Sequence, residues 1–372
     1  RLIFDRIGAW GDALQATAIE TVHVSQRGGF GRATLRASDA GVPALGYTIS
    51  YNALSNVLSD RLADTAVQYI WEAMVAHTEK SGDEVLIDAQ IAGAPRQLRA
   101  RLAVLADGGR GLMANQRDIA RANDTQGKDY VGSNDMRVKD YAGSNDMRVK
   151  DYAQSNDMRV KDYAQCALTA LVKTQRPHNG CAYERFTPSG PTALLPVRDR
   201  FALVWIAPRA QSERLLGLND AEFLVELQQH FGDRQGRFLE IGARAAFPLS
   251  LRYAREIALP GVVRVGNAAQ AVHPVAGQGF NLGLRDAWSL SRLVLEADAQ
   301  ALNGAALARA YARTRRVDRA IGIGLTDFLV NIFETDRPLL RAARGAGLWL
   351  LETGGPLRRA FTRAMLFGSS SR

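Results

Sequence analysis

Hydrophobic residues follow two different periods in the first part of the chain. They alternate with polar residues around Val22 and around Leu35, which predicts two strands joined by a glycine-rich turn. Between 53 and 77 they recur every three or four positions, which predicts one long helix. Alternation returns at 84–90 and 98–105, so we expect a β-hairpin there.

The second half of the chain begins with strand patterns and ends with helical ones. Alternating stretches separated by Pro and Gly predict an antiparallel sheet, with strands at 167–173, 182–186, 193–197 and 201–207. A helix is expected over 220–231, with Asn219 as its N-cap. A short buried strand at 262–265 precedes a helix that starts near Gly279, and the remainder is predicted to be helical to about Phe367.

The segment 122–165 is a tandem repeat of 11 residues. Lys-Asp-Tyr recurs at 128, 139, 150 and 161, and Asn-Asp-Met-Arg-Val is repeated word for word from 134, 145 and 156. Solenoid repeats are usually ~20 or more residues long and carry an apolar face. This unit has few apolar side chains among many charged ones. We therefore expect a solvated expansion of a surface connection and not a binding array.

The composition excludes several classes of protein. A hydrophobic fraction of 47% is typical of a globular chain and not of a disordered one. The chain contains 2 Cys and 5 His, and no His is spaced with a Cys or another His as metal ligands are, so neither a metal site nor a disulfide scaffold is expected. No apolar run approaches the ~20 residues of a transmembrane helix, and no signal peptide opens the chain. These features favour a cytoplasmic protein.

The net charge of +9 is concentrated at the C-terminal end. Residues 301–372 contain 12 Arg, no Lys and 5 acidic residues, while the rest of the chain is nearly balanced. Positive charge confined to one helical end, without a recognised motif, argues against nucleic acid as a partner. It fits three alternatives: a peripheral position on the anionic inner face of a membrane, docking on partner enzymes, or a helical cap with a solvated basic face.

The strongest candidate for a binding site is a glycine-rich turn that ends an apolar strand and opens a helix. It reads Arg264-Val-Gly-Asn-Ala-Ala-Gln-Ala-Val-His-Pro-Val-Ala-Gly-Gln-Gly-Phe-Asn-Leu-Gly-Leu-Arg-Asp286. Its glycines allow a flat ligand to approach the main chain, and the first N–H groups of the helix suit negative charge. A reduced flavin is flat and develops negative charge, which matches this geometry. For a bare Gly-x-Gly, a helix cap with tight helix–strand packing is the alternative.

This turn resembles the second flavin signature of the aromatic-ring flavoprotein monooxygenases, the p-hydroxybenzoate hydroxylase class. Within that class the chain is similar to the ubiquinone-biosynthesis hydroxylases, most of all to the 2-octaprenyl-6-methoxyphenol hydroxylases. Further segments resemble this family in the same order, namely Thr21-Val-His-Val-Ser-Gln-Arg-Gly, Gly41-Val-Pro-Ala-Leu-Gly, Tyr183-Glu-Arg-Phe-Thr-Pro and Gly190-Pro-Thr-Ala-Leu-Leu-Pro. The resemblance covers nearly all of the chain except the repeat.

The resemblance implies FAD as the cofactor and NAD(P)H as the electron donor. The residues that it assigns to FAD are Asp107, Gly108, Gly266, Asn267, Pro274, Gly277, Gln278, Gly279, Phe280 and Asn281. His273 and Pro274 are expected near the flavin, and no residue is assigned as catalytic because the flavin carries the chemistry. Two positions depart from the Asp-Gly motif of the family, which usually has Ser and Arg where this chain has Gly111 and Ala114. Asn267 stands where most of the class has Asp, although the most similar hydroxylases also use Asn.

The fold implied by the resemblance is α/β (α+β). A Rossmann-like FAD-binding domain carries an inserted antiparallel substrate-binding sheet and is followed by a helical C-terminal region. The family's N-terminal βαβ unit with Gly-x-Gly-x-x-Gly is expected to be lacking here. The expected parts are the FAD-binding domain (1–17, 47–121 and 254–300), the sheet domain (18–46 and 166–253), the repeat insertion (122–165) and the basic helical region (301–372).

The activity implied by the resemblance is hydroxylation of the aromatic ring of a polyprenyl phenol in ubiquinone biosynthesis. The oxidant is O₂, and one of its oxygen atoms is transferred to the ring from a flavin C4a-hydroperoxide. Two alternatives stay open. One is an FAD-dependent isoprenoid oxidoreductase that hydroxylates no ring, and the other is a non-catalytic, N-terminally truncated remnant.

Overall fold

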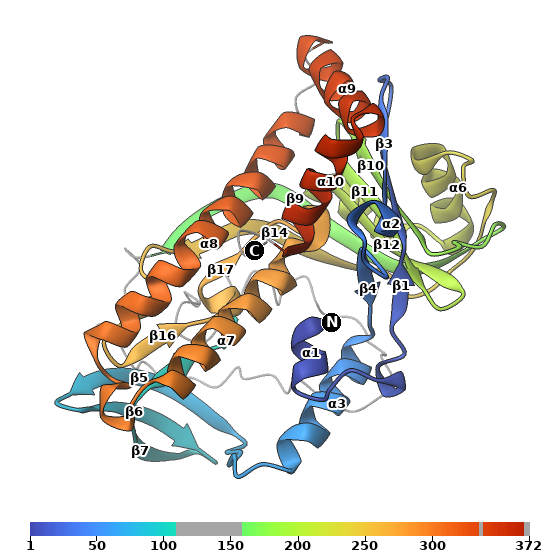
Figure 1. The fold of residues 1–372 in the computed structure, drawn as a ribbon. Helices are drawn as coiled ribbons and strands as arrows, with labels where there is room; N and C mark the ends of the chain where they lie inside the picture. The colour runs from blue at the N-terminus through green and yellow to red at the C-terminus, as the bar shows by residue number, and fades with distance from the viewer. Residues whose placement is uncertain (109–157, 335–337, 368–372) are drawn as a thin grey trace.

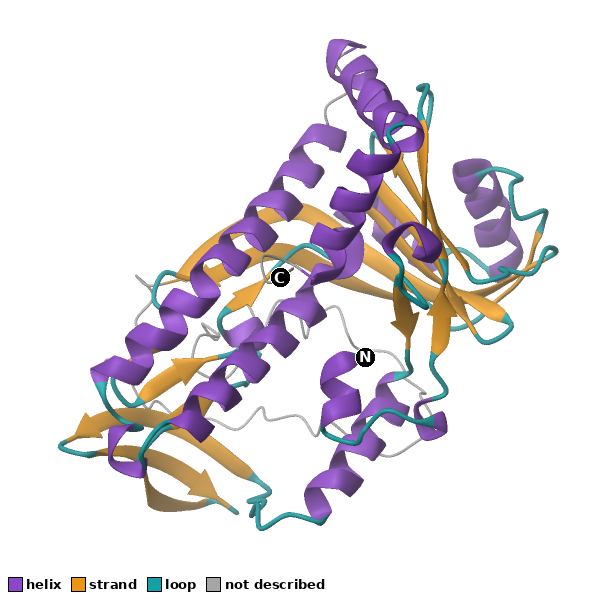
Figure 2. Ribbon diagram, viewed as in Figure 1, coloured by secondary structure: helices purple, strands orange, loops and turns teal. Residues whose placement is uncertain are grey.

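The computed structural model describes residues 1–108, 158–334 and 338–367. Most of the repeat, together with Gly111 and Ala114, lies outside the described residues. The described part is a mixed α/β structure, as expected. A large sheet and the α6 helix occupy one end, and a three-stranded meander occupies the opposite end (Figures 1 and 2).

The large sheet has nine strands, in the order β17-β14-β9-β12-β11-β10-β2-β3, with β13 paired to β9. Its strands are β2 (Thr21–Gln26), β3 (Arg32–Arg36), β9 (Met158–Thr174), β10 (Cys181–Thr187), β11 (Gly190–Val197), β12 (Arg200–Pro208), β13 (Phe238–Ile241), β14 (Ala245–Ala254) and β17 (Gln270–Ala271). The N-terminal hairpin joins the later strands, as expected. The sheet is not wholly antiparallel, however, because β2 runs parallel to β10. In the sheet, β2 lies between β10 and β3. It pairs antiparallel with β3, which is the edge strand.

The sheet reaches back into the last copy of the repeat, which differs from the expected surface connection. β9 begins at Met158 and pairs with β14 along its whole first half. A bulge interrupts this pairing near Ala164, whose φ is +54°. The Nζ of Lys161 lies 2.6 Å from Asp327 Oδ1, and the hydroxyl of Tyr163 donates to the same oxygen at 3.0 Å. Tertiary partners on a distant helix therefore fix a strand that the repeat alone does not predict.

One hydrophobic core lies between the large sheet and α6 (Asp220–Phe231). Phe223 and Leu227 of this helix pack against Trp205 and neighbouring sheet residues, and all are fully buried. Asn219 is the N-cap, as predicted: its Oδ1 accepts the N–H of Glu222 at 3.0 Å, and the Glu222 carboxylate accepts the N–H of Asn219 at 3.1 Å. This capping box fixes where the helix begins.

The long helix expected over 53–77 is wrong in its second half. The α3 helix spans only Tyr51–Ala63, and Ser50 caps it by accepting the N–H of Ala53 at 3.1 Å. β5 (Ala73–Ser81) follows and pairs with β6 (Glu84–Ile91), which in turn pairs with β7 (Ala94–Ala100). No residue of α3 is buried, so no packing face extends the helix, and pairing with β6 decides the later residues.

A second, smaller sheet connects the two ends of the molecule. Its order is β15-β16-β8, formed by β15 (Ala258–Leu259), β16 (Val262–Arg264) and β8 (Ala103–Leu105). β16 and β8 are parallel. Buried residues of this region, among them Val263, Leu290 and Tyr311, form a core with α7 (Gln278–Glu296) and α8 (Ala305–Glu334).

The C-terminal region is helical to Phe367, as predicted. After α8 come α9 (Pro338–Thr353) and α10 (Gly355–Phe367). α9 contacts the edge strand β3, where the N–H of Thr34 donates to Glu352 Oε2 at 2.6 Å. Among the described helices, none combines the length and apolar character that crossing a bilayer requires.

Replacing Asn219 with Ala is expected to lower the free energy of unfolding by about 1 kcal/mol, because the capping box loses its side-chain acceptor. Asn219→Asp is the matched control, since it keeps an acceptor oxygen at the same place. Urea unfolding followed by circular dichroism compares the two. A loss as large for Asp as for Ala would contradict the capping role.

Candidate functional site

Two turns meet at the edge where β8 and β16 end. The strands are parallel, with Arg264 in register with Leu105, and the N–H of Val265 donates to the Leu105 carbonyl at 3.0 Å. Asp107-Gly108 follows β8 and Gly266-Asn267 follows β16, so the structure brings these two predicted segments to one edge. Gly108 and Gly266 adopt φ values of +73° and +59°, which glycine reaches without strain. Ligands of α/β proteins bind at such carboxyl edges of parallel strands.

The chain then turns into α7 through a helix start that has no side-chain cap. Gly277 is the N-cap with φ +61°, and it has no side chain to accept the N–H groups of the first turn. A Cβ built on Gly277 meets nothing within 4 Å, and one on Gly279 meets only Val272 Cγ2, at 3.6 Å. The N-terminal turn of α7 is thus accessible to a ligand at its main chain. Its N–H groups and the helix dipole favour a negative charge there.

The other predicted site residues surround this helix start. Pro274 and Asn281 are exposed, and the Phe280 side chain is 58% exposed. Asn267 is exposed beside β16 in a single 3₁₀ turn, Gly266–Ala268. The Asn281 amide points back along the helix start, with its Nδ2 3.5 Å from the Gly277 carbonyl.

Gly266 and Gly283 allow the turn after β16 to lie close to α7. A Cβ at Gly283 would lie 3.2 Å from Gly266 Cα, so any side chain there would push the 266–268 turn away from α7. The third glycine of the motif therefore serves helix–turn packing. The sequence left open a helix cap with tight packing as the alternative role: in the structure Gly277 is the N-cap of α7, and the tight packing is at Gly283.

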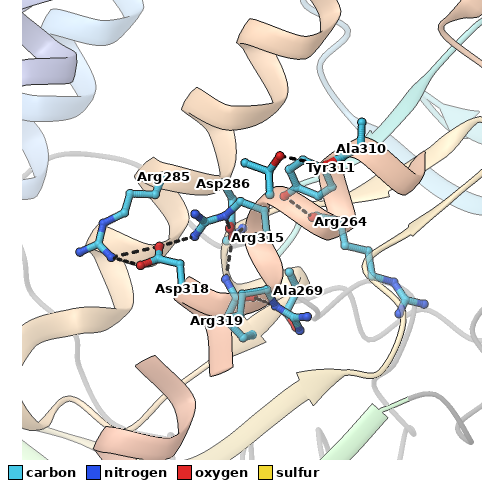
Figure 3. Close-up of polar contacts among 12 residues, drawn as sticks. Arg264, Ala269, Arg285, Asp286, Ala310, Tyr311, Arg315, Asp318 and Arg319 are labelled. Carbon is cyan, nitrogen blue, oxygen red and sulfur yellow. Dashed lines mark hydrogen bonds and ion pairs between the residues drawn. The ribbon is translucent and has the colours of Figure 1, made fainter. Parts of the chain in front are cut away.

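Asp286 is the polar hub beneath these turns. Its side chain is fully buried and accepts hydrogen bonds from the N–H of Gly266 at 3.0 Å and from Gln270 Nε2 at 2.6 Å. It accepts a third from Arg315 Nε at 2.7 Å (Figure 3). One carboxylate on α7 therefore fixes the turn after β16, the strand β17 and the helix α8. Asp286 ends the glycine-rich sequence motif, and no local pattern there indicates its buried role.

α7 and α8 both supply cations to this network. Arg315 lies 2.9 Å from Asp318, and Arg285 of α7 makes two hydrogen bonds to the same carboxylate, at 2.8 and 3.0 Å (Figure 3). Burial opposes ionisation of Asp318, but Arg285 and then Arg315 outweigh it and lower the pKa of its carboxyl group. Arg319 Nε donates to Gln270 Oε1 at 2.6 Å.

The position of these cations corrects one expectation. The charge pattern places all arginines of 301–372 in one basic region, but Arg315 is 3% exposed and binds Asp286, and Arg319 binds Gln270. Arg315 and Arg319 are four residues apart and lie on the face of α8 that also carries Tyr311. This helical spacing is the sequence pattern that indicates a shared inner face. The hydroxyl of Tyr311 donates to the Arg264 carbonyl at 3.0 Å.

His273 lies immediately before Pro274 and is 1% exposed. Its Nδ1 accepts the N–H of Val275 at 3.2 Å, and burial lowers the pKa of its imidazole to about 4. The ring of Tyr163 meets it edge to face, with centroids 5.1 Å apart. His273 is therefore a neutral side chain, held next to the start of α7.

This arrangement suits the binding of a ligand at the main chain. Within the described residues, no group of three or more His, Cys, Asp or Glu side chains has metal-ligand geometry. Both cysteines are free thiols. The open helix start and the two turns instead fit a flat ligand that carries negative charge.

Comparison with known proteins supports this conclusion. A family model described as "FAD binding domain" matches residues 3–320. The ubiquinone hydroxylase UbiL of Rhodospirillum rubrum is 39% identical over 202 residues, which are 54% of this chain and 47% of that protein. The 3-demethoxyubiquinol 3-hydroxylase of Escherichia coli is 34% identical over 198 residues, 52% of this chain and 50% of that protein. The chain spans about half the length of the curated relatives it matches.

Solved structures share the fold. The p-nitrophenol 4-monooxygenase PnpA of Pseudomonas putida superimposes with a TM-score of 0.67 at 14% identity, covering 97% of this chain and 85% of that one. The flavin-dependent brominase Bmp2 gives a TM-score of 0.63 at 13% identity, and the match covers 98% of this chain and 81% of that one. At this level of identity the likeness concerns the fold alone.

Asp286→Asn is expected to lower the free energy of unfolding by about 3 kcal/mol, because the buried Arg315 loses one of its charged partners. Glu296→Gln, on the same helix, is the matched control. It breaks a 3.4 Å ion pair with Arg292 whose side chains are 63% and 65% exposed, and is expected to cost less than about 0.5 kcal/mol. Urea unfolding measures both, and a small, equal loss in the two variants would refute the hub role.

Proposed function

Because the chain belongs to the FAD binding domain family, we propose that its α7 turn and the Asp107-Gly108 turn together hold FAD. We further propose that the protein uses NAD(P)H and O₂ to hydroxylate the aromatic ring of a polyprenyl phenol in ubiquinone biosynthesis. Relatives named for ubiquinone hydroxylation support the substrate class. The observation that carries the proposal is the uncapped start of α7 beside the carboxyl ends of two parallel strands.

The residues present fit a flavin. Gly277 and Gly279 leave the main chain open to a flat ring, and Gly266-Asn267 and Asp107-Gly108 lie where the remainder of a dinucleotide would pass. When bound, FAD supplies the redox chemistry: it accepts electrons from a nicotinamide and activates O₂ for transfer to the phenol. The chain itself supplies N–H donors at α7 that stabilise negative charge on the ring.

Apolar side chains of the large sheet and of α8 cover the turn that leads into α7, which supports the proposal. Val275, directly after Pro274, is buried against Phe186 of β10 and Val330 of α8, with Val24 of β2 beside them. These side chains exclude water from one side of the turn. A dry wall of this kind suits an aromatic ring and protects reactive oxygen chemistry from solvent.

Flavin binding is tested by adding FAD to the purified chain and recording the flavin absorbance near ~450 nm after gel filtration. The wild-type chain is expected to retain FAD. Gly279→Asp is expected to weaken binding at least ~10-fold, because it places a side chain and a negative charge where the ring approaches. Gly347→Asp is the control, at an exposed glycine of α9 with nothing within 4 Å of its Cβ. A wild-type chain that stays colourless would favour the non-catalytic remnant.

The reaction is tested with NADPH or NADH, O₂ and a short-chain prenyl phenol. One hydroxylated product per nicotinamide oxidised is expected. Oxidation of the nicotinamide with a reduced or dehydrogenated isoprenoid as the only product would instead favour the oxidoreductase alternative.

We also propose that the outer face of α8 lies on an anionic membrane surface, where a polyprenyl phenol would reside. Val317, Ile321 and Phe328 are at helical spacing on this face and are each 50–57% exposed. Arg313 and Arg316 are exposed at its start. An apolar stripe flanked by arginines is typical of helices that lie in the interface of acidic bilayers.

Co-sedimentation with liposomes tests this surface. The chain is expected to bind vesicles of phosphatidylglycerol more than neutral ones, and Phe328→Glu is expected to reduce binding at least ~5-fold by placing a charge in the apolar stripe. Leu295→Glu is the matched control, since Leu295 is 85% exposed at the end of α7. Equal vesicle binding by the two variants, or no vesicle binding by the wild type, would contradict the membrane surface. The basic region would then serve to dock partner enzymes or form a solvated helical cap.

A further inference from the structure

The imidazole of His273 has one tautomer in this fold. Its Nδ1 accepts the N–H of Val275 at 3.2 Å, and a nitrogen that accepts a hydrogen bond carries no proton. A neutral imidazole has a single N–H, so the proton lies on Nε2. The ring is neutral at physiological pH, because burial lowers its pKa to about 4. His273 is therefore a fixed hydrogen-bond donor through Nε2.

This donor has no hydrogen-bond acceptor among the residues that the structure describes. The Nε2 atom is buried and makes no hydrogen bond, although the side chain is only 1% exposed. Buried donors are nearly always paired, since an unpaired one forfeits the hydrogen bond that water would make. By contrast, both nitrogens of His178 have backbone partners, at 2.6 and 3.1 Å.

The surroundings hold His273 in one place. Tyr163 packs against it edge to face, with ring planes at 88°. The hydroxyl of Tyr163 in turn donates to Asp327 of α8, which also pairs with Lys161. Along the chain, His273 precedes the uncapped N-cap of α7, Gly277, by four residues. A donor fixed in this way loses little freedom when it binds a ligand.

We propose that His273 Nε2–H donates a hydrogen bond to an acceptor atom of the ligand at the α7 turn. The acceptor is an oxygen or nitrogen of the flavin ring, or the phenol oxygen of the substrate. This inference rests on the proposed function and adds a specific polar contact to it. His273 acts as a neutral donor, and no proton is transferred.

Two substitutions separate the two nitrogens of the ring. His273→Asn keeps an acceptor at the place of Nδ1 for the Val275 N–H and removes the Nε2 donor. His273→Gln places an amide N–H₂ near Nε2 and restores the donor. Neither variant removes a protein partner of Nε2, so the FAD-free Asn variant is expected to unfold within a few degrees of the wild type.

FAD affinity and the absorbance spectrum of bound flavin are measured for both variants, with the Kd of the phenol from its perturbation of that spectrum. If the flavin is the acceptor, His273→Asn weakens FAD binding about tenfold and shifts the flavin spectrum, and His273→Gln restores the affinity and the spectrum. If the phenol is the acceptor, FAD affinity is unchanged in both variants. The phenol Kd then rises about tenfold in His273→Asn and returns to the wild-type value in His273→Gln.

Two results would overturn the inference. One is wild-type affinity for both ligands in the Asn variant. The other is a large loss of FAD-free stability in Asn, which would show that Nε2 has a structural partner such as the face of the Tyr163 ring. Failure of the wild-type chain to bind FAD would contradict the proposed function instead, so the two failures are distinguishable.

Discussion

The site depends on one buried carboxylate. Asp286 binds Gly266, Gln270 and Arg315 at once, so a turn, a strand and a helix that are distant in sequence share a single fixed point. Such a charge is tolerated in the interior because each of its two oxygens accepts a hydrogen bond and Arg315 forms an ion pair with it. The position of the glycine turn over α7 follows from this arrangement.

α8 has two faces with opposite chemistry. Its inner face presents Tyr311, Arg315 and Asp318 to the network around Asp286, while its outer face presents Val317, Ile321 and Phe328 to the outside. The same helix also reaches the last copy of the repeat, through Asp327. The proposed flavin turn, the proposed membrane surface and the sheet thus share one helix, so a substrate taken from that surface would enter close to the turn.

The sheet contributes to the site through a strand that looked like part of an insertion. The last copy of the repeat shares Asn-Asp-Met-Arg-Val-Lys-Asp-Tyr-Ala with the two copies before it, and its Tyr163 packs on His273 near the apolar cluster of Val275. The role of this copy follows from what lies beside it in the fold. Strand pairing with β14 and the two bonds to Asp327 supply that context.

The sequence by itself determined the glycine turn, the start of α7, the cap of α6 and the helical C-terminal region, because these depend on residue types within a few positions of one another. Only the tertiary structure decided the end of α3 at Ala63, the parallel pairing of β2 with β10, and the inward position of Arg315 and Arg319, which bind Asp286 and Gln270. These features depend on partners far away in the chain. A local pattern of hydrophobic and charged residues does not specify which distant strand or carboxylate will meet it.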